Sequence, residues 1–230
     1  MKKNTGVKYL ASGIDEFQPG SGGKVLKNLL VITSARKMHE TEFSGYLSAE
    51  RRVMTEFTKG QWITLDDIHR IHTWFLGDIY SWAGTIRSVN ISKAGFTFAT
   101  AYALPAALKE FADHVLPAHT PPRGESLKEI AEHIATVQCE FLLLHPYREG
   151  NGRTARLVAT LMAYQAGLPG IDFSFIGGRG KEFRRYVTAI QKGVGKNYTL
   201  MTEIVLRGLR RALRRAGASS IAWTTVRSWT

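Results

Sequence analysis

The chain has 230 residues, 44% of them hydrophobic, a single cysteine and a formal net charge of +12. This length and apolar content predict one domain with its own core, and one cysteine excludes an internal disulfide framework. The charge favours anionic partners such as nucleotides, nucleic acid, a membrane surface or an acidic protein, without choosing among them.

The first elements follow from turn residues and caps. Glycine, serine and proline are frequent at residues 11–24, so we predict an extended arm at residues 1–35 and a helical domain at residues 36–210. Scattered apolar positions indicate a helix within residues 38–58. Thr64 is typical of an N-cap, and its helix is expected to run to about Trp82 and end at Gly84.

Residues 86–99 break the helical pattern, because β-branched and aromatic residues surround Ala94-Gly95. This predicts a β-hairpin, and a lone hairpin is expected to pack on the helices as a flap. Apolar spacing predicts further helices at residues 104–116 and from Ser126 to Leu144. Residues 205–230 are predicted to form a basic C-terminal helix and tail, and the arginines are interpreted as a solvated face.

The segment from His145 to Arg156 lies between two apolar helical stretches. Pro146 stops the first helix and favours an extended backbone at His145. The run Gly150-Asn151-Gly152 permits a nest of backbone N–H groups at the start of the next helix, which suits an anion.

Charged side chains complete this segment. Arg153 and Arg156 lie one helical turn apart and suit a di- or triphosphate. Glu149 is the kind of carboxylate that holds Mg²⁺ beside phosphates, and His145 is the natural general base. The set predicts phosphoryl or nucleotidyl transfer, in which catalysis is mostly positioning and charge stabilisation.

The same segment resembles the Fic family signature, in which His-Pro-Phe is followed by an acidic residue, Gly-Asn-Gly-Arg and a second Arg. Tyr147 replaces the usual Phe. Residues 68–72, 77–87 and 90–96 are also similar to the family, so the resemblance spans about residues 25–210. It implies an all-α Fic/Fido helical bundle with one β-hairpin flap.

The resemblance further implies a protein adenylyltransferase that uses ATP and Mg²⁺. AMP would pass to a Tyr, Thr or Ser hydroxyl of a target protein, with release of pyrophosphate. The implied catalytic residues are His145, Asn151 and Arg153, and the implied metal ligand is Glu149. The implied nucleotide-binding residues are Lys93, Gly150, Asn151, Gly152, Arg153, Thr154, Ala155, Arg156, Tyr186 and Ile190. The implied target-docking flap consists of Ile91, Ser92, Lys93, Ala94, Gly95 and Phe96.

Several alternatives stay open. Core packing explains Tyr186 and Ile190 as well as an adenine pocket does. A phosphate-transferring branch of the family has lysine in place of the second glycine, so Gly152 favours AMP over this phosphotransferase alternative. A basic nucleic-acid-binding module would explain the charge, but no recognised binding motif accompanies it, so no stable nucleic-acid complex is expected. His69 and His72 have a spacing that two metal ligands use, without a third ligand.

Two patterns that the sequence lacks bear on regulation and location. Many members of the family carry an inhibitory helix with Ser or Thr, three residues, then Glu and Gly or Asn, and we find no such pattern. Arg156 is therefore expected to lack an intrinsic partner, and inhibition would come from a separate antitoxin-like protein. No secretory leader or membrane span is legible, which predicts a cytoplasmic protein, as a toxin or as an effector exported by another signal.

Overall fold

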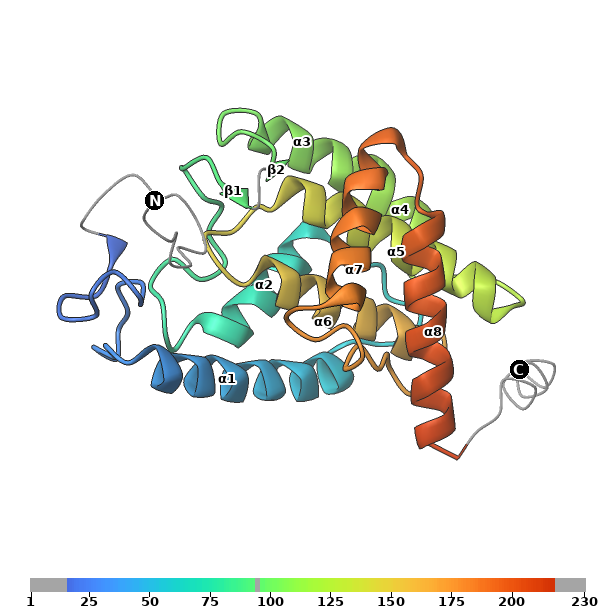
Figure 1. Ribbon diagram of the computed structural model, residues 1–230. Helices are drawn as coiled ribbons and strands as arrows, with labels where there is room; N and C mark the ends of the chain where they lie inside the picture. Colours follow the sequence, from blue (N-terminus) through green and yellow to red (C-terminus); the bar gives the residue numbers. More distant parts are fainter. Residues whose placement is uncertain (1–15, 94–95, 218–230) are drawn as a thin grey trace.

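Helix α5 (Leu127–Leu144) lies at the centre of the fold and packs against α6 (Asn151–Gln165) and α8 (Thr199–Arg215) (Figure 1). A capping box between Ser126 and Glu129 opens α5, as the sequence predicts. The computed structural model describes residues 16–93 and 96–217, apart from the side chain of Lys93. Within these residues the protein is mostly helical and contains almost no strand, which confirms the all-α prediction.

Helices α1 (Ala35–Glu56) and α2 (Leu65–Leu76) pack against each other and against α6. Thr64 caps α2 as predicted, through a reciprocal bond with Asp67. The prediction that this helix reaches Trp82 is wrong. The carbonyl of Leu76 accepts the N–H groups of both Ile79 and Tyr80, so the chain turns there and buries these two side chains.

The remaining helical elements surround the α5–α6 pair. The predicted helix at residues 104–116 is present, but a π-helical turn interrupts it: α3 (Leu104–Glu110), η2 (Phe111–Val115) and α4 (Leu116–His119) follow in succession. Helix α7 (Lys181–Lys192) and the short 3₁₀ turn η3 (Gly193–Gly195) lead into α8. None of the helices in the described part of the chain is long and apolar enough to cross a membrane.

The predicted hairpin consists of β1 (Ser92–Lys93) and β2 (Phe96–Thr97), paired antiparallel. Ala94 and Gly95, predicted at its turn, lie outside the described residues. Ala99 N–H donates to the carbonyl of Leu143 at 3.4 Å, so the hairpin is fastened to the C-terminal end of α5. This agrees with a flap packed on helices.

The described part of the predicted arm, residues 16–34, is a closed loop and not an extended segment. An isolated bridge joins Phe17 to Leu26, and the Asn28 side chain bonds to the backbone at Leu26 and Ile32. An asparagine that satisfies several backbone groups bends a chain that glycine alone would leave open. Residues 1–15 lie outside the described residues.

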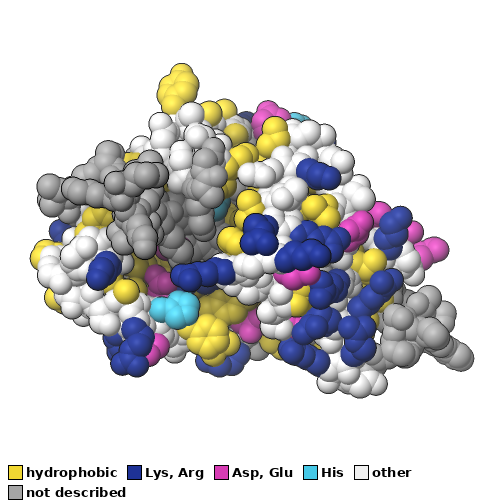
Figure 2. All heavy atoms as spheres, in the orientation of Figure 1, with side chains coloured by type: hydrophobic (Ala, Val, Ile, Leu, Met, Phe, Trp, Pro, Cys, Tyr) yellow, Lys and Arg dark blue, Asp and Glu magenta, His cyan; other side chains and the backbone are white. Residues whose placement is uncertain are grey.

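Basic side chains gather over α7 and α8 (Figure 2). Residues 179–215 contain eleven Lys and Arg against two Glu. Some of the charge is used within the fold, since Arg207 pairs with Glu182 and Arg211 with Asp172. Helix α8 is continuous across residues 205–210, and the predicted tail at residues 218–230 lies outside the described part.

Candidate active site

His145 ends α5 in a left-handed backbone conformation, with φ 50° and ψ 56°. The prediction of an extended residue before Pro146 is wrong. The N–H of His145 still bonds to the carbonyl of Phe141, which closes the last helical turn. A non-glycine residue in this region is strained, and such residues cluster at functional sites.

The imidazole of His145 is held on two sides. Its Nδ1 lies 3.2 Å from the carbonyl of Leu142, and because a carbonyl only accepts, Nδ1 carries the proton. Phe98 stacks on the ring, with centroids 3.8 Å apart and planes inclined by 14°. With Nδ1 committed to this carbonyl, Nε2 is the ring nitrogen that can take a proton, which is the geometry of a general base.

Arg87 fixes the backbone around this histidine. Its Nε donates to the carbonyl of His145 at 2.8 Å, and its Nη2 to that of Leu144 at 3.2 Å. The same guanidinium also bonds to the carbonyls of Val89 and Ala99, on either side of the hairpin. One buried side chain thus ties the base to the hairpin.

The loop after His145 ends at Gly150, which has φ +85° and starts α6. A Cβ at Gly150 would lie 2.9 Å from Leu76 Cδ1, so only glycine fits. The side chain of Asn151 holds the loop closed by accepting from Tyr147 N–H and donating to its carbonyl. No acceptor among the described residues binds the N–H groups of Asn151 and Gly152, and a Cβ at Gly152 would meet nothing within 4 Å.

This helix start suits phosphate. Two backbone N–H groups, the positive end of α6 and open space meet at Gly152. Thr154 and Ala155 are buried in the first turn of α6, so their side chains support the helix, and only their backbone lies near this opening.

A chain of polar contacts surrounds Glu149. Its Oε1 accepts from Gly150 N–H at 3.0 Å and from Arg153 Nη2 at 3.3 Å. Arg153 Nη1 reaches Glu42 Oε2 on α1 at 2.7 Å, and Tyr80 donates to the other oxygen of Glu42 at 2.8 Å. Burial alone would lower the pKa of Arg153, but Glu42 and Glu149 raise it above its usual value, so it stays charged.

One carboxylate beside an amide nest matches the donor set that Mg²⁺ takes when phosphates supply the other oxygens. Glu149 is buried beside this nest, and its role as a metal ligand stays a prediction. Across the described residues, no group of three or more His, Cys, Asp and Glu side chains forms a metal site by itself.

Arg156 is half-buried and lies beside the predicted adenine-pocket residue Tyr186. Its guanidinium is 5.8 Å from the ring centroid of Tyr186 and 5.7 Å from that of Phe173. No carboxylate within residues 16–93 and 96–217 forms an ion pair with it. Ile190 lies one turn beyond Tyr186 on α7 and packs against the core.

The histidines of α2 support the loop and do not form a metal pair. His72 Nδ1 accepts from Gly84 N–H and its Nε2 donates to the carbonyl of Glu149. Burial lowers the pKa of His72 to about 4, which keeps the ring neutral. His69 Nδ1 is 2.8 Å from the Tyr147 hydroxyl, and Tyr147 stacks on His72.

The structure describes some of the predicted flap residues. Ile91 is buried and its carbonyl accepts from Phe98 N–H, and Ser92 faces Thr97 across the hairpin. The backbone of Lys93 pairs with Phe96, and the Lys93 side chain lies outside the described part. Sequence reasoning missed Glu42 and Tyr80, placed Phe98 in the flap without its contact to His145, and gave Arg87 no role of its own.

Comparison with known proteins identifies a family and several relatives that this chain resembles. The Fic/DOC family model matches residues 62–163. The chain is 30% identical over 161 residues to protein adenylyltransferase VbhT of Bartonella schoenbuchensis, and the match covers 70% of this chain and 33% of that protein. It is also 30% identical over 164 residues to the probable protein adenylyltransferase y4lH of Sinorhizobium fredii, with 70% and 81% covered. The chain thus spans a third of the length of VbhT and four fifths of that of y4lH.

Among solved structures, the fold is similar to that of the BepC protein of Bartonella tribocorum with bound AMPPNP. The TM-score is 0.69 at 22% identity, and the match covers 84% of this chain and 95% of that one. An N-terminal Fic domain from Bartonella quintana with bound ADP gives a TM-score of 0.65 at 23% identity, with 84% and 93% covered.

Proposed function

The chain belongs to the Fic/DOC family, and on this premise we propose that it is a protein adenylyltransferase, which moves AMP from ATP to a Tyr, Thr or Ser hydroxyl of a target protein. The observation that carries the proposal is the junction at His145. A histidine with Nδ1 committed to a carbonyl lies a few residues from two backbone N–H groups at an open helix start.

The triphosphate would bind at the start of α6. The N–H groups of Asn151 and Gly152 would donate to phosphate oxygens, and Arg156 would neutralise the terminal phosphate from one turn further along. Glu149 would hold Mg²⁺, which when bound neutralises phosphate charge. Arg153 is bonded to Glu42 and Glu149, so its contribution to a phosphate contact requires a rearranged side chain.

The chemical step requires one proton transfer and one displacement. His145 Nε2 takes the proton of the target hydroxyl, and the hydroxyl oxygen then forms a bond to the α-phosphorus of ATP. The bond from that phosphorus to the bridging oxygen breaks, so pyrophosphate leaves and AMP stays on the target. The hairpin formed by β1 and β2 has no third strand among the described residues, so its edge is available to align the target by strand addition.

Two details favour AMP transfer without intrinsic control. Gly152 leaves open space, where the phosphate-transferring branch of the family has a lysine side chain. The described residues give Arg156 no carboxylate partner, so we expect control at this arginine to come from a separate antitoxin-like protein.

The test uses the full chain with Mg²⁺ and ATP labelled on either the α- or the γ-phosphate, and a cell lysate as the source of targets. We expect labelled protein only from the α-position, and none with His145→Ala. His114→Ala is the matched control, because His114 is an exposed histidine far along the chain from the loop. Label from the γ-position alone would replace this proposal with a phosphotransferase.

A further inference from the structure

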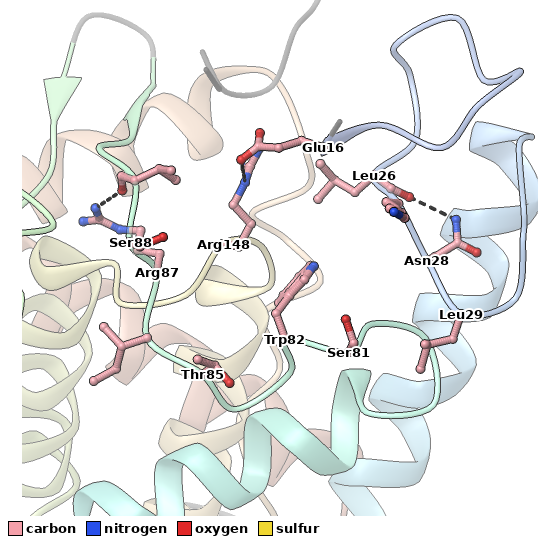
Figure 3. Close-up of a pocket in the computed structure, with 13 residues that line it drawn as sticks. Glu16, Leu26, Asn28, Leu29, Ser81, Trp82, Thr85, Arg87, Ser88 and Arg148 are labelled. Atoms are coloured by element: carbon pink, nitrogen blue, oxygen red, sulfur yellow. Dashed lines mark hydrogen bonds and ion pairs between the residues drawn. The ribbon is translucent and has the colours of Figure 1, made fainter. Parts of the chain in front are cut away.

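A pocket opens beside the active-site loop, on the side of the closed loop formed by residues 16–34 (Figure 3). Its volume is about 420 Å³. One wall is the closed loop, another is the segment 81–89, and Arg148 forms the third. Arg148 is three residues after His145, and Arg87 in the second wall bonds to the carbonyl of His145. The pocket wall therefore contains Arg87, which bonds to the predicted base, and Arg148, which follows the base in the same loop.

The lining favours an apolar occupant. Leu26, Leu29, Trp82, Ile86 and Val89 line the pocket, and Trp82 rises between Arg148 and Leu26 (Figure 3). Glu16 and Arg148 lie opposite the tryptophan and pair with each other at 2.7 Å. Their charges are matched within the wall. Lys27 and Arg87 also line the pocket, but its lining surface is more apolar than polar, so it offers apolar contact area.

Hydrogen bonds brace the turn that carries Leu29 into the pocket wall. Asn28 uses its side chain to bond to Leu26 and Ile32, and the N–H of Leu29 donates to the carbonyl of Ile79 at 2.8 Å. This bracing keeps Leu29, Leu30 and Val31 at the surface, where 57%, 48% and 69% of each is exposed.

Val31, two positions after Leu29, adds strain to this turn. Its φ is 54°, a conformation that a β-branched residue rarely adopts. Three consecutive exposed apolar residues on a braced, strained turn cost stability, and such a turn persists where it has a use.

We propose that this pocket is a specificity site, which takes a bulky apolar side chain from the target protein near its modified hydroxyl. The inference rests on the proposed function, because it takes the hairpin as the place where the target protein is aligned. Segment 81–89 runs on directly into β1, so a target strand aligned on the hairpin and continued along this segment meets the pocket. Targets with an apolar residue at that distance would be preferred by roughly ten- to a hundredfold in kcat/KM over targets without one.

The test compares Leu29→Glu with Val194→Glu. Both residues are exposed valine or leucine side chains, so neither change is expected to unfold the protein, and Val194 lies in η3, away from the pocket. The probe is the protein most strongly labelled from α-labelled ATP, purified and used at varied concentration. Leu29→Glu should raise the KM for this protein about tenfold, with kcat and the KM for ATP within twofold of wild type. Val194→Glu should change none of the three.

The outcomes separate the two proposals. If the wild-type chain transfers no α-label, the proposed function fails, and the pocket proposal fails with it. If transfer is intact and Leu29→Glu leaves the target KM unchanged, or Val194→Glu raises it equally, only the pocket proposal fails. As a second measurement, Leu29 is replaced by the photo-crosslinker p-benzoylphenylalanine. A crosslink to the labelled target supports the site, whereas a crosslink only to the chain itself or to a second copy overturns it.

Discussion

Arg153 on α6 lies 2.7 Å from Glu42 on α1, and only 10% of the Glu42 side chain is exposed. Removing one partner of a buried pair leaves the other charge uncompensated, at a cost of about 3–5 kcal/mol. Since Arg153 keeps its contact to Glu149, we expect Glu42→Gln to lower the unfolding free energy by about 3 kcal/mol in urea titrations.

Glu56→Gln is the matched control for this change. Glu56 pairs with Arg52 on the exposed side of the same helix, so its loss should cost under about 1 kcal/mol. Equal costs for the two substitutions would mean that the Glu42–Arg153 contact contributes nothing beyond an exposed pair.

Phe98 is expected to act through His145. Truncation to alanine removes the ring that stacks at 3.8 Å, so the imidazole gains rotational freedom. Phe98→Ala should lower kcat for AMP transfer roughly ten- to a hundredfold, because small misplacements of a catalytic group have effects of that size. Phe98→Tyr keeps the ring and should restore most of the rate. A Phe98→Ala variant with wild-type kcat would rule out this role.

The two glycines of the loop make a matched pair. Gly150→Ala places a methyl group 2.9 Å from Leu76 Cδ1 on a backbone with φ +85°, and should cost about 2–3 kcal/mol of stability. Gly152→Ala meets no atom within 4 Å and improves helix propensity, so stability should rise by about 0.5–1 kcal/mol.

Gly152→Ala is also expected to change the affinity for ATP, which separates binding from stability. The new methyl group at position 152 occupies the space assigned to phosphate, so Gly152→Ala should weaken ATP binding at least tenfold, measured by calorimetry. Unchanged ATP affinity in this stable variant would contradict the phosphate site at the start of α6.

Acid should destabilise the protein through His119. Burial first, and then neighbouring His133, lower the pKa of His119, while Glu140 opposes the shift. Unfolded histidine titrates near about 6.5. The unfolded chain therefore binds more protons than the folded one as the pH falls below that value, and the unfolding free energy decreases.

His119→Gln should flatten this dependence between about pH 7.5 and pH 5.5, measured by urea unfolding across that range. Exposed His114 provides the comparison, and His114→Gln should keep the wild-type slope. Identical slopes for all three proteins would mean that the contact between His119 and His133, 2.9 Å between Nδ1 atoms, does not affect titration.

The parts of the site predicted from sequence are those that local chemistry determines. The run Gly150-Asn151-Gly152 and the caps of α2 and α5 act within a few residues, so their pattern is legible. The backbone of His145 was predicted wrongly because the bias from Pro146 is local, whereas Arg87 binds the His145 carbonyl across 58 positions. Glu42 had no signal at all, because its partner Arg153 is 111 positions away.

The prediction of where α2 ends is wrong for a similar reason. Helical spacing continues through Trp82, but Tyr80 turns inward to reach Glu42, and this contact outweighs local propensity. Composition predicts the hairpin. Its attachment to α5 depends on contacts with Leu143 and Arg87, and the spacing of apolar residues does not predict these contacts.

In the proposed mechanism, Arg87 couples the alignment of the target at the hairpin to the position of the base. Its guanidinium is shared between carbonyls at the hairpin and carbonyls at the end of α5, so pulling the hairpin away strips the same cation that anchors the catalytic backbone. In that mechanism, a bound target that seats the hairpin would tighten this shared anchor. The enzyme would then assemble its base most completely when the correct protein is already in place.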